Sequence, residues 1–137
     1  MSTVQRSFRI KEPLLQEIER IRKNETANAL ANELLEEALK MRRCPGIIFS
    51  QGITRRRARI AGTGVEVWEV VYEYQIVGKD VEALKKALPH LTERQFIAAL
   101  NYYRAYPEEI DELIQSNEAI TSKTVEGRFS LPRVKSR

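Results

Sequence analysis

The N-terminal stretch constrains the fold of this chain more than any other feature. Residues 3–11, with the sequence TVQRSFRIK, alternate in side-chain character as a β-strand does. Residues 12–43 have helical periodicity instead, so no second strand lies close by in the sequence. A strand with an unpaired edge tends to associate with another chain. The sequence therefore predicts a strand that pairs with its own copy in a twofold dimer.

Two amphipathic helices are expected after this strand. The first, EPLLQEIERIRKNE, places Leu14 and Ile18 on one face, and the second, TANALANELLEEALKMRR, does the same with its leucines. Thr26 or Asn28 is positioned to cap the second helix. A strand and two short helices bury too little surface to be stable alone. This N-terminal domain, residues 1–43, therefore needs a partner.

A second domain is predicted after a clear break in the pattern. Pro45 and Gly46 interrupt the helix and mark the boundary. The stretches GIIFS and RARIAG then predict a β-hairpin. The stretch VEVWEVVYEYQIV is rich in strand-forming residues, but its glutamates recur at helical intervals, and we expect a helix. Residues 45–118 are expected to form a small, mainly helical domain with this hairpin.

Local signals locate three more helices in the second domain. Asp80 is a good N-cap for the first, and Thr92 with Gln95 forms a capping box for the second. Pro107, followed by two glutamates, opens the last helix. Residues 119–137 are basic and aperiodic, and we expect a flexible tail there. The predicted fold class is mainly α with short β structure.

Composition argues against several classes of protein. The chain of 137 residues has one cysteine and one histidine, which excludes an internal disulfide and a zinc site of the usual Cys/His kind. No apolar run approaches the ~20 residues that span a bilayer, and the N-terminus does not resemble a signal peptide. We expect a cytoplasmic protein with no membrane partner, no metal and no cofactor. The carboxylates between Glu108 and Glu112 are explained by the dipole of the last helix, so an enzyme is not expected.

Positive charge is concentrated in the predicted hairpin. Residues 44–64 contain four arginines and no acidic residue, whereas residues 65–118 contain five basic and eleven acidic residues. Contact of the run TRRRAR with a DNA backbone is one interpretation, and a solvated hairpin tip is the other. The candidate phosphate contacts in this run are Arg55, Arg56 and Arg57.

The stretches SFRIKEPLLQEI and ELLEEAL resemble the ribbon-helix-helix family of DNA-binding proteins, of the Arc and MetJ type. The resemblance covers roughly residues 4–43 and implies a dimer with an intermolecular β-ribbon, in which Phe8 and Ile10 face the helices. Such a ribbon fits the major groove of B-DNA. The residues expected to read base edges are Gln5, Ser7 and Arg9. The start of the second helix, at Thr26 and Asn28, is expected to hold a phosphate; a strand that only dimerises the protein is the alternative.

The second domain has a resemblance of its own. PGIIF, RRARIAGTGVEVWEVV and LPHLTERQFIAALNYYRAYPEEI fall in order, over residues 45–106, as in the domain-of-unknown-function 433 family. Members are usually described as VapB-type antitoxin modules and are commonly encoded beside a PIN-like ribonuclease toxin. The resemblance implies a helix-turn-helix-like arrangement of residues 80–88 and 92–105. Because the segment is acidic, binding of a protein is favoured over binding of DNA.

The C-terminal tail suggests how a toxin could be neutralised. PIN-like ribonucleases hold Mg²⁺ with clustered carboxylates, and a basic partner segment can fold onto such a site. The tail sequence EGRFSLPRVKSR has charged and apolar side chains suited to that role. The candidate toxin-binding residues are Arg128, Phe129, Leu131 and Arg133. A tail that only adds solubility is the alternative.

Taken together, these features predict an antitoxin of a type II toxin–antitoxin system. As a homodimer it would bind a double-stranded DNA operator and repress its own operon. By direct binding it would neutralise a PIN-like ribonuclease toxin. A ribbon-helix-helix transcriptional regulator without a toxin partner is the second hypothesis.

Overall fold

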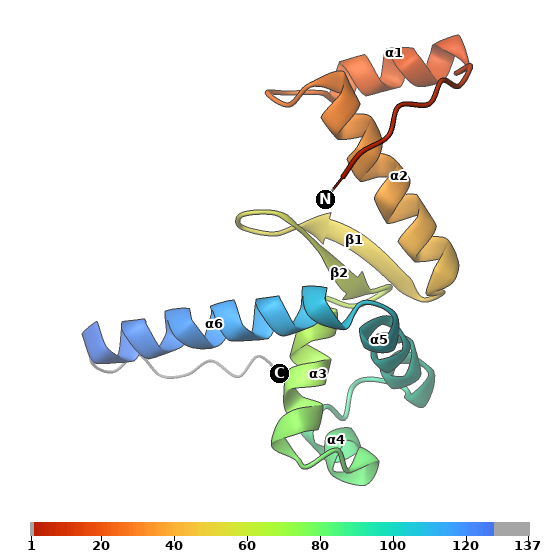
Figure 1. Ribbon diagram of the computed structural model, residues 1–137. Helices are drawn as coiled ribbons and strands as arrows, with labels where there is room; N and C mark the ends of the chain where they lie inside the picture. Colours follow the sequence, from red (N-terminus) through yellow and green to blue (C-terminus); the bar gives the residue numbers. More distant parts are fainter. Residues whose placement is uncertain (1, 128–137) are drawn as a thin grey trace. The chain divides into compact units, whose positions relative to one another are not determined.

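The computed structural model describes the backbone of residues 2–127 and the side chains of residues 2–117. This part of the chain forms six helices and a two-stranded antiparallel sheet (Figure 1). It divides into two compact units, one ending at Lys40 and the other beginning at Met41. The prediction of a mainly helical chain with a short hairpin is confirmed. The elements, in order, are α1 (Glu12–Ile21), α2 (Ala27–Arg43), β1 (Ile47–Gln51), β2 (Arg56–Ile60), α3 (Val67–Ile76), α4 (Val81–Ala87), α5 (Glu93–Ala105) and α6 (Pro107–Gly127).

The first unit begins with a segment that has no regular secondary structure. Residues 2–11 form no strand within the single chain, and the pairing predicted for them involves a second copy. Lys11 is the N-cap of α1, and a proline follows in the first turn, where its missing N–H costs little. On the surface of α1, Arg20 pairs with Glu17 at 2.6 Å. Such exposed pairs add little stability, and α1 buries none of its residues.

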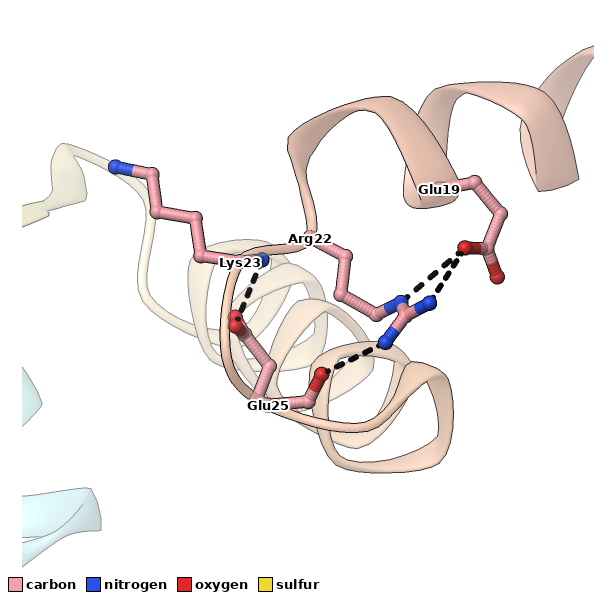
Figure 2. Close-up of polar contacts among 4 residues, drawn as sticks. All are labelled: Glu19, Arg22, Lys23 and Glu25. Atoms are coloured by element: carbon pink, nitrogen blue, oxygen red, sulfur yellow. Dashed lines mark hydrogen bonds and ion pairs between the residues drawn. The ribbon is translucent and has the colours of Figure 1, made fainter.

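Polar contacts hold the turn between α1 and α2 (Figure 2). The guanidinium group of Arg22 donates to the carboxylate of Glu19 at 2.9 Å and to the backbone carbonyl of Glu25 at 3.3 Å. The backbone N–H of Lys23 donates to the carboxylate of Glu25 at 3.0 Å. Bonds from the backbone N–H groups of Glu25 and Lys23 lower the pKa of this carboxyl group. The turn is therefore shaped by local, exposed hydrogen bonds.

The second unit opens with the predicted hairpin. β1 and β2 are antiparallel, with Ile47 opposite Ile60, and the sheet packs against α3 and α5. Ala58 and Ile60 of β2 are buried. Because side chains alternate along a strand, Arg57 and Arg59 lie on the opposite face. The hairpin thus has one face in the core and one basic face.

The stretch with conflicting signals is helical, as predicted. Glu66 and Glu69 form a reciprocal capping box at the start of α3. Val67, Val70 and Val71 are completely buried, so three strand-forming residues pack on one side of a helix. Here the helical spacing of the apolar residues outweighs their intrinsic strand preference.

The predicted helix starts in the second unit are also confirmed. Asp80 accepts a hydrogen bond from the N–H of Glu82 at 3.0 Å at the start of α4. Thr92 and Gln95 form the expected capping box of α5, with bonds of 3.1 Å and 2.8 Å. Pro107 is the first residue of α6. Each of these starts depends on contacts within a few residues of sequence.

The end of α6 differs from the prediction. The backbone remains helical to Gly127, whereas the sequence predicted a flexible tail from residue 119. The physical reason is that α6 contains no proline or glycine between Pro107 and Gly127, and loss of apolar periodicity does not by itself end a helix. Residues 128–137 lie outside the described residues.

The core of the second unit is formed where α3 packs against β2, α4, α5 and α6. Tyr102 of α5 is completely buried, and its hydroxyl donates to the carboxylate of Glu109 on α6, at 2.9 Å from each oxygen. Its ring lies 6.3 Å from that of Phe49 and 5.0 Å from that of Tyr106, between centroids. The core side chains include Ile47, Ala58, Ile60, Val67, Val70, Val71, Leu84, Leu88, Phe96, Ala99, Tyr102 and Ile110.

Candidate nucleic-acid interface

The three predicted base-reading residues lie in the N-terminal segment that precedes α1. Gln5, Ser7 and Arg9 are all exposed. In the same segment the guanidinium group of Arg6 donates to the backbone carbonyl of Gln5 at 3.1 Å. The candidate residues are therefore accessible, and their common face depends on the ribbon that a second copy would complete.

Most apolar side chains of the first unit are exposed. Among residues 2–40, Leu30 alone is buried, and α1 buries none of its residues. Phe8 is 84% exposed and Ile10 is 49% exposed. Other exposed apolar side chains are Val4, Leu14, Leu15, Ile21, Leu34, Leu35 and Leu39. A single copy leaves uncovered the side chains that the predicted dimer would bury.

The two candidate phosphate contacts of the first unit differ in their roles. Thr26 is the residue that caps α2, because its hydroxyl oxygen accepts from the N–H of Ala29 at 3.0 Å. Asn28 lies in the first turn, and its backbone carbonyl accepts from the side chain of Asn32 at 2.8 Å. Since the cap uses the N–H of Ala29, a phosphate at this end would have to use the earlier N–H groups.

The three candidate arginines of the hairpin are not equivalent. Arg55 is exposed in the turn. Arg56 donates to the backbone carbonyl of Phe49 at 3.2 Å. Arg57 forms an ion pair with Glu66 at 3.4 Å, and both side chains are about three-quarters buried. Arg56 and Arg57 differ because neighbouring residues of β2 face opposite sides of the hairpin, and Arg55 differs from both because it lies in the turn before β2.

The candidate phosphate contacts named from the sequence left out Arg59, the last residue of the run TRRRAR, and Ile53. Arg59 lies on the same face as Arg57, which the alternation of RRRAR could have revealed. Ile53, in the turn, is 94% exposed. Next to this face, the indole N–H of Trp68 donates to the carboxylate of Glu66 at 2.7 Å. Glu66 therefore connects the basic face of the hairpin with the start of α3.

The start of α5, the second helix of the implied helix-turn-helix, presents mixed charge. Arg94 is exposed, but the side chain of Gln95 is used in the capping box. Glu93 lies 3.6 Å from Lys85 of α4. This end of the helix lacks the concentration of positive charge found on the hairpin.

Other candidate sites are limited within the part of the chain that the structure describes. There, no group of three or more His, Cys, Asp or Glu side chains is placed to hold a metal ion. No helix in this part is both long enough and apolar enough to cross a membrane. The candidate toxin-binding residues Arg128, Phe129, Leu131 and Arg133 fall outside the described residues.

Comparison with known proteins found a family match and a similar solved structure. No curated protein matches the chain. Among solved structures, it is similar to a DUF433 member protein from Anabaena variabilis ATCC 29413, with 27% sequence identity and a TM-score of 0.44, over 78% of this chain and 99% of that one. Residues 47–103 match the family model described as Protein of unknown function (DUF433). The predicted likeness to the domain-of-unknown-function 433 family is thus confirmed for residues 47–103, which contain the hairpin and α3 to α5 up to Tyr103.

Proposed function

We propose that this protein is a dimeric, DNA-binding repressor that also acts as the antitoxin of a type II toxin–antitoxin system. The observation that carries the proposal is the exposure of apolar side chains in the first unit. With Leu30 the one buried residue among residues 2–40, this unit has almost no core of its own. Its helices are stabilised only if another surface covers them.

A second copy is the partner that fits best. In a twofold ribbon, each N-terminal segment supplies the missing hydrogen-bond partners of the other. Phe8 and Ile10 would then be buried against the helices of both copies. Burial of a side chain the size of Phe8 stabilises a complex by about 1.5–3 kcal/mol. The dimer therefore accounts for both the unpaired backbone and the exposed apolar residues.

The outer face of that ribbon would read DNA. Alternation places Gln5, Ser7 and Arg9 on the face away from the helices. Glutamine can bond adenine bidentately, arginine can bond guanine, and serine can either donate or accept. Thr26 and Asn28 lie at the start of α2, where backbone N–H groups would position a phosphate. The resemblance to ribbon-helix-helix proteins over residues 4–43 supports this assignment.

The antitoxin role is assigned to the second half of the chain. Its support is the likeness of residues 47–103 to the domain-of-unknown-function 433 family together with the residues of the C-terminal segment. Arg128 and Arg133 would replace metal charge among the carboxylates of a PIN-like ribonuclease, and Phe129 with Leu131 would anchor the segment.

The DNA-binding role can be tested by substitution in the ribbon. Gln5→Ala and Arg9→Ala are each expected to weaken binding to the DNA upstream of the gene by about 1–3 kcal/mol, roughly 5- to 150-fold, because each removes a bidentate base contact. Gel-shift titration at fixed salt measures the change, with Lys86→Ala on α4 as the control. Unchanged affinity in both variants would rule out base reading by the ribbon.

The antitoxin role can be tested by removing residues 128–137. We expect the full chain to co-purify with the nuclease encoded beside it and to inhibit RNA cleavage. The chain ending at Gly127 should bind DNA normally but leave the nuclease active. Inhibition by the shortened chain would contradict the role given to the C-terminal segment. Absence of a nuclease-like neighbour would favour a transcriptional regulator without a toxin.

A further inference from the structure

The basic face of the hairpin carries arginines in a row. Arg57 and Arg59 occupy alternate positions of β2, opposite Ser50 and Ile48 of β1, and their side chains point away from the core. Alternate residues of a strand are about 6.6 Å apart. Arg55 precedes them by two residues and is exposed. Arg57 and Arg59 therefore share one face of the hairpin, and Arg55 lies in the turn directly before this strand.

Negative charge near this row is limited and already engaged. Residues 44–64 contain no acidic side chain. The nearby carboxylate of Glu66 accepts from the indole N–H of Trp68 at 2.7 Å and lies 3.4 Å from Arg57. One carboxylate shared in this way leaves the row with net positive charge. Such a row attracts a polyanion.

Two nitrogens of this row lack the partners that buried groups normally have. Within the described residues, Nε of Arg57 and Nε of Arg59 are buried without a hydrogen-bond acceptor. A buried, unsatisfied donor is uncommon and points to a missing water or ligand. Gly52 contributes to the shape, because a Cβ there would lie 3.0 Å from Nε of Arg57 and 2.6 Å from the carbonyl oxygen of Arg55. Because these Nε atoms are buried, a phosphate approaching from outside would contact the terminal N–H groups of the two guanidinium groups.

We propose that the row formed by Arg55, Arg57 and Arg59 binds the phosphodiester backbone of a nucleic acid. A linear row matches the regularly spaced charges of one strand better than it matches a compact acidic patch on a protein. Ile53, 94% exposed in the adjoining turn, supplies an apolar contact for sugars or base edges. This inference rests on the proposed function in one respect, which is that operator DNA is taken as the natural ligand. The hairpin would add a contact with the DNA backbone that does not depend on base sequence.

The decisive experiment measures how salt affects binding of the full chain to labelled duplex DNA of random sequence. Arg55→Gln together with Arg59→Gln leaves the Arg57–Glu66 ion pair intact. This variant should bind about tenfold more weakly at low salt. Because each lost phosphate contact reduces the slope of log affinity against log salt by about 0.9, its slope should fall by about two. Fluorescence anisotropy provides both values.

Controls separate this row from general charge and from the N-terminal site. Lys86→Gln with Arg104→Gln removes the same charge from exposed positions of α4 and α5 and should leave the slope unchanged. In an Arg9→Ala background, the hairpin substitutions should still lower the salt slope on random DNA. DNA binding by the ribbon and DNA binding by the arginine row can therefore be rejected separately. If the double hairpin variant does not fold, Arg55→Gln alone should lower the slope by about one.

The same titration is carried out with duplex DNA and with single-stranded RNA of equal length. If the salt slope is reduced in the hairpin variant, the proposal is supported. The nucleic acid that binds more tightly is then the preferred ligand of the hairpin. A hairpin variant with the same slope as the control variant would overturn it. So would equal competition by polyglutamate at matched charge, because that result would indicate an acidic protein partner instead.

Discussion

The hydroxyl group of Tyr102 makes a buried hydrogen bond between two helices of the second unit. It donates to both carboxylate oxygens of Glu109 at 2.9 Å, from a side chain with no exposed surface. Burial, together with the charge and hydrogen bonding of Glu109, raises the pKa of Tyr102 well above its usual value near 10. Through this bond a core side chain ties α5 to the first turns of α6.

We predict that Tyr102→Phe lowers the free energy of unfolding by about 1 kcal/mol at neutral pH, the usual contribution of one hydrogen bond. The raised pKa adds a pH dependence. Above pH ~10 the unfolded tyrosine loses its proton while the folded one keeps it, so stability falls as pH rises. Tyr102→Phe should remove part of that fall.

Urea unfolding at several pH values between neutral and strongly alkaline measures this effect. Tyr72→Phe on α3 is the matched control, since it deletes the same atom elsewhere in the unit. An identical alkaline slope in the wild type and in Tyr102→Phe would show that the hydrogen bond to Glu109 does not govern the titration.

Single residues were predictable from the sequence where their partners are close in the chain. The side chains of Asp80, Thr92 and Gln95 bond to backbone groups no more than three residues away. In the structure they cap the starts of α4 and α5. The bond from Tyr102 to Glu109 joins two helices across a proline, and nothing in the spacing identifies it. Arg59 belonged to the predicted basic run TRRRAR but was not named as a candidate contact, although strand alternation places it on the face of Arg57.

At the scale of elements, the periodicity of apolar residues predicted helices correctly, but its loss did not predict where a helix ends. α3 is a helix despite its valines, because their spacing buries them on one side and a capping box starts it. Beyond residue 119 the periodicity fades, but α6 continues to Gly127 because no breaker precedes that residue. The hairpin was predictable from two apolar runs around a turn, whereas the unsatisfied nitrogens on its outer face depend on side-chain placement.

The residues before α1 show what the structure of a single copy does not reveal about pairing between copies. Their alternation predicts a strand, and in the single chain residues 2–11 form none. Strand pairing is a property of two segments, so a partner in another molecule leaves no trace in one copy. The ribbon and its base-reading face accordingly remain predictions.

At the scale of the whole molecule, the two units differ in how much surface they bury. Within residues 41–117 the side chains form a continuous core, whereas the first unit has one buried residue among residues 2–40. We predict that Phe8→Ser raises the dissociation constant of the homodimer about a hundredfold or more. The reason is that two phenylalanine side chains leave the interface, at about 1.5–3 kcal/mol each.

Sedimentation over a range of protein concentrations measures this constant. Ile53→Ser, which replaces an exposed apolar side chain of the hairpin, is the control and should associate as the wild type does. A wild-type chain that stays monomeric at every concentration, or a Phe8→Ser chain that associates normally, would remove the basis of the proposed repressor.

The near-absence of burial in α1 has a consequence for the life of the protein in a cell. A helix of ten residues with no packed side chain opens readily in water, and proteases cleave backbone that opens. Newly made copies that have not yet met one another would be degraded first. The half-life of the chain would then lengthen as its abundance rises, and a pause in its synthesis would be followed by accelerating loss.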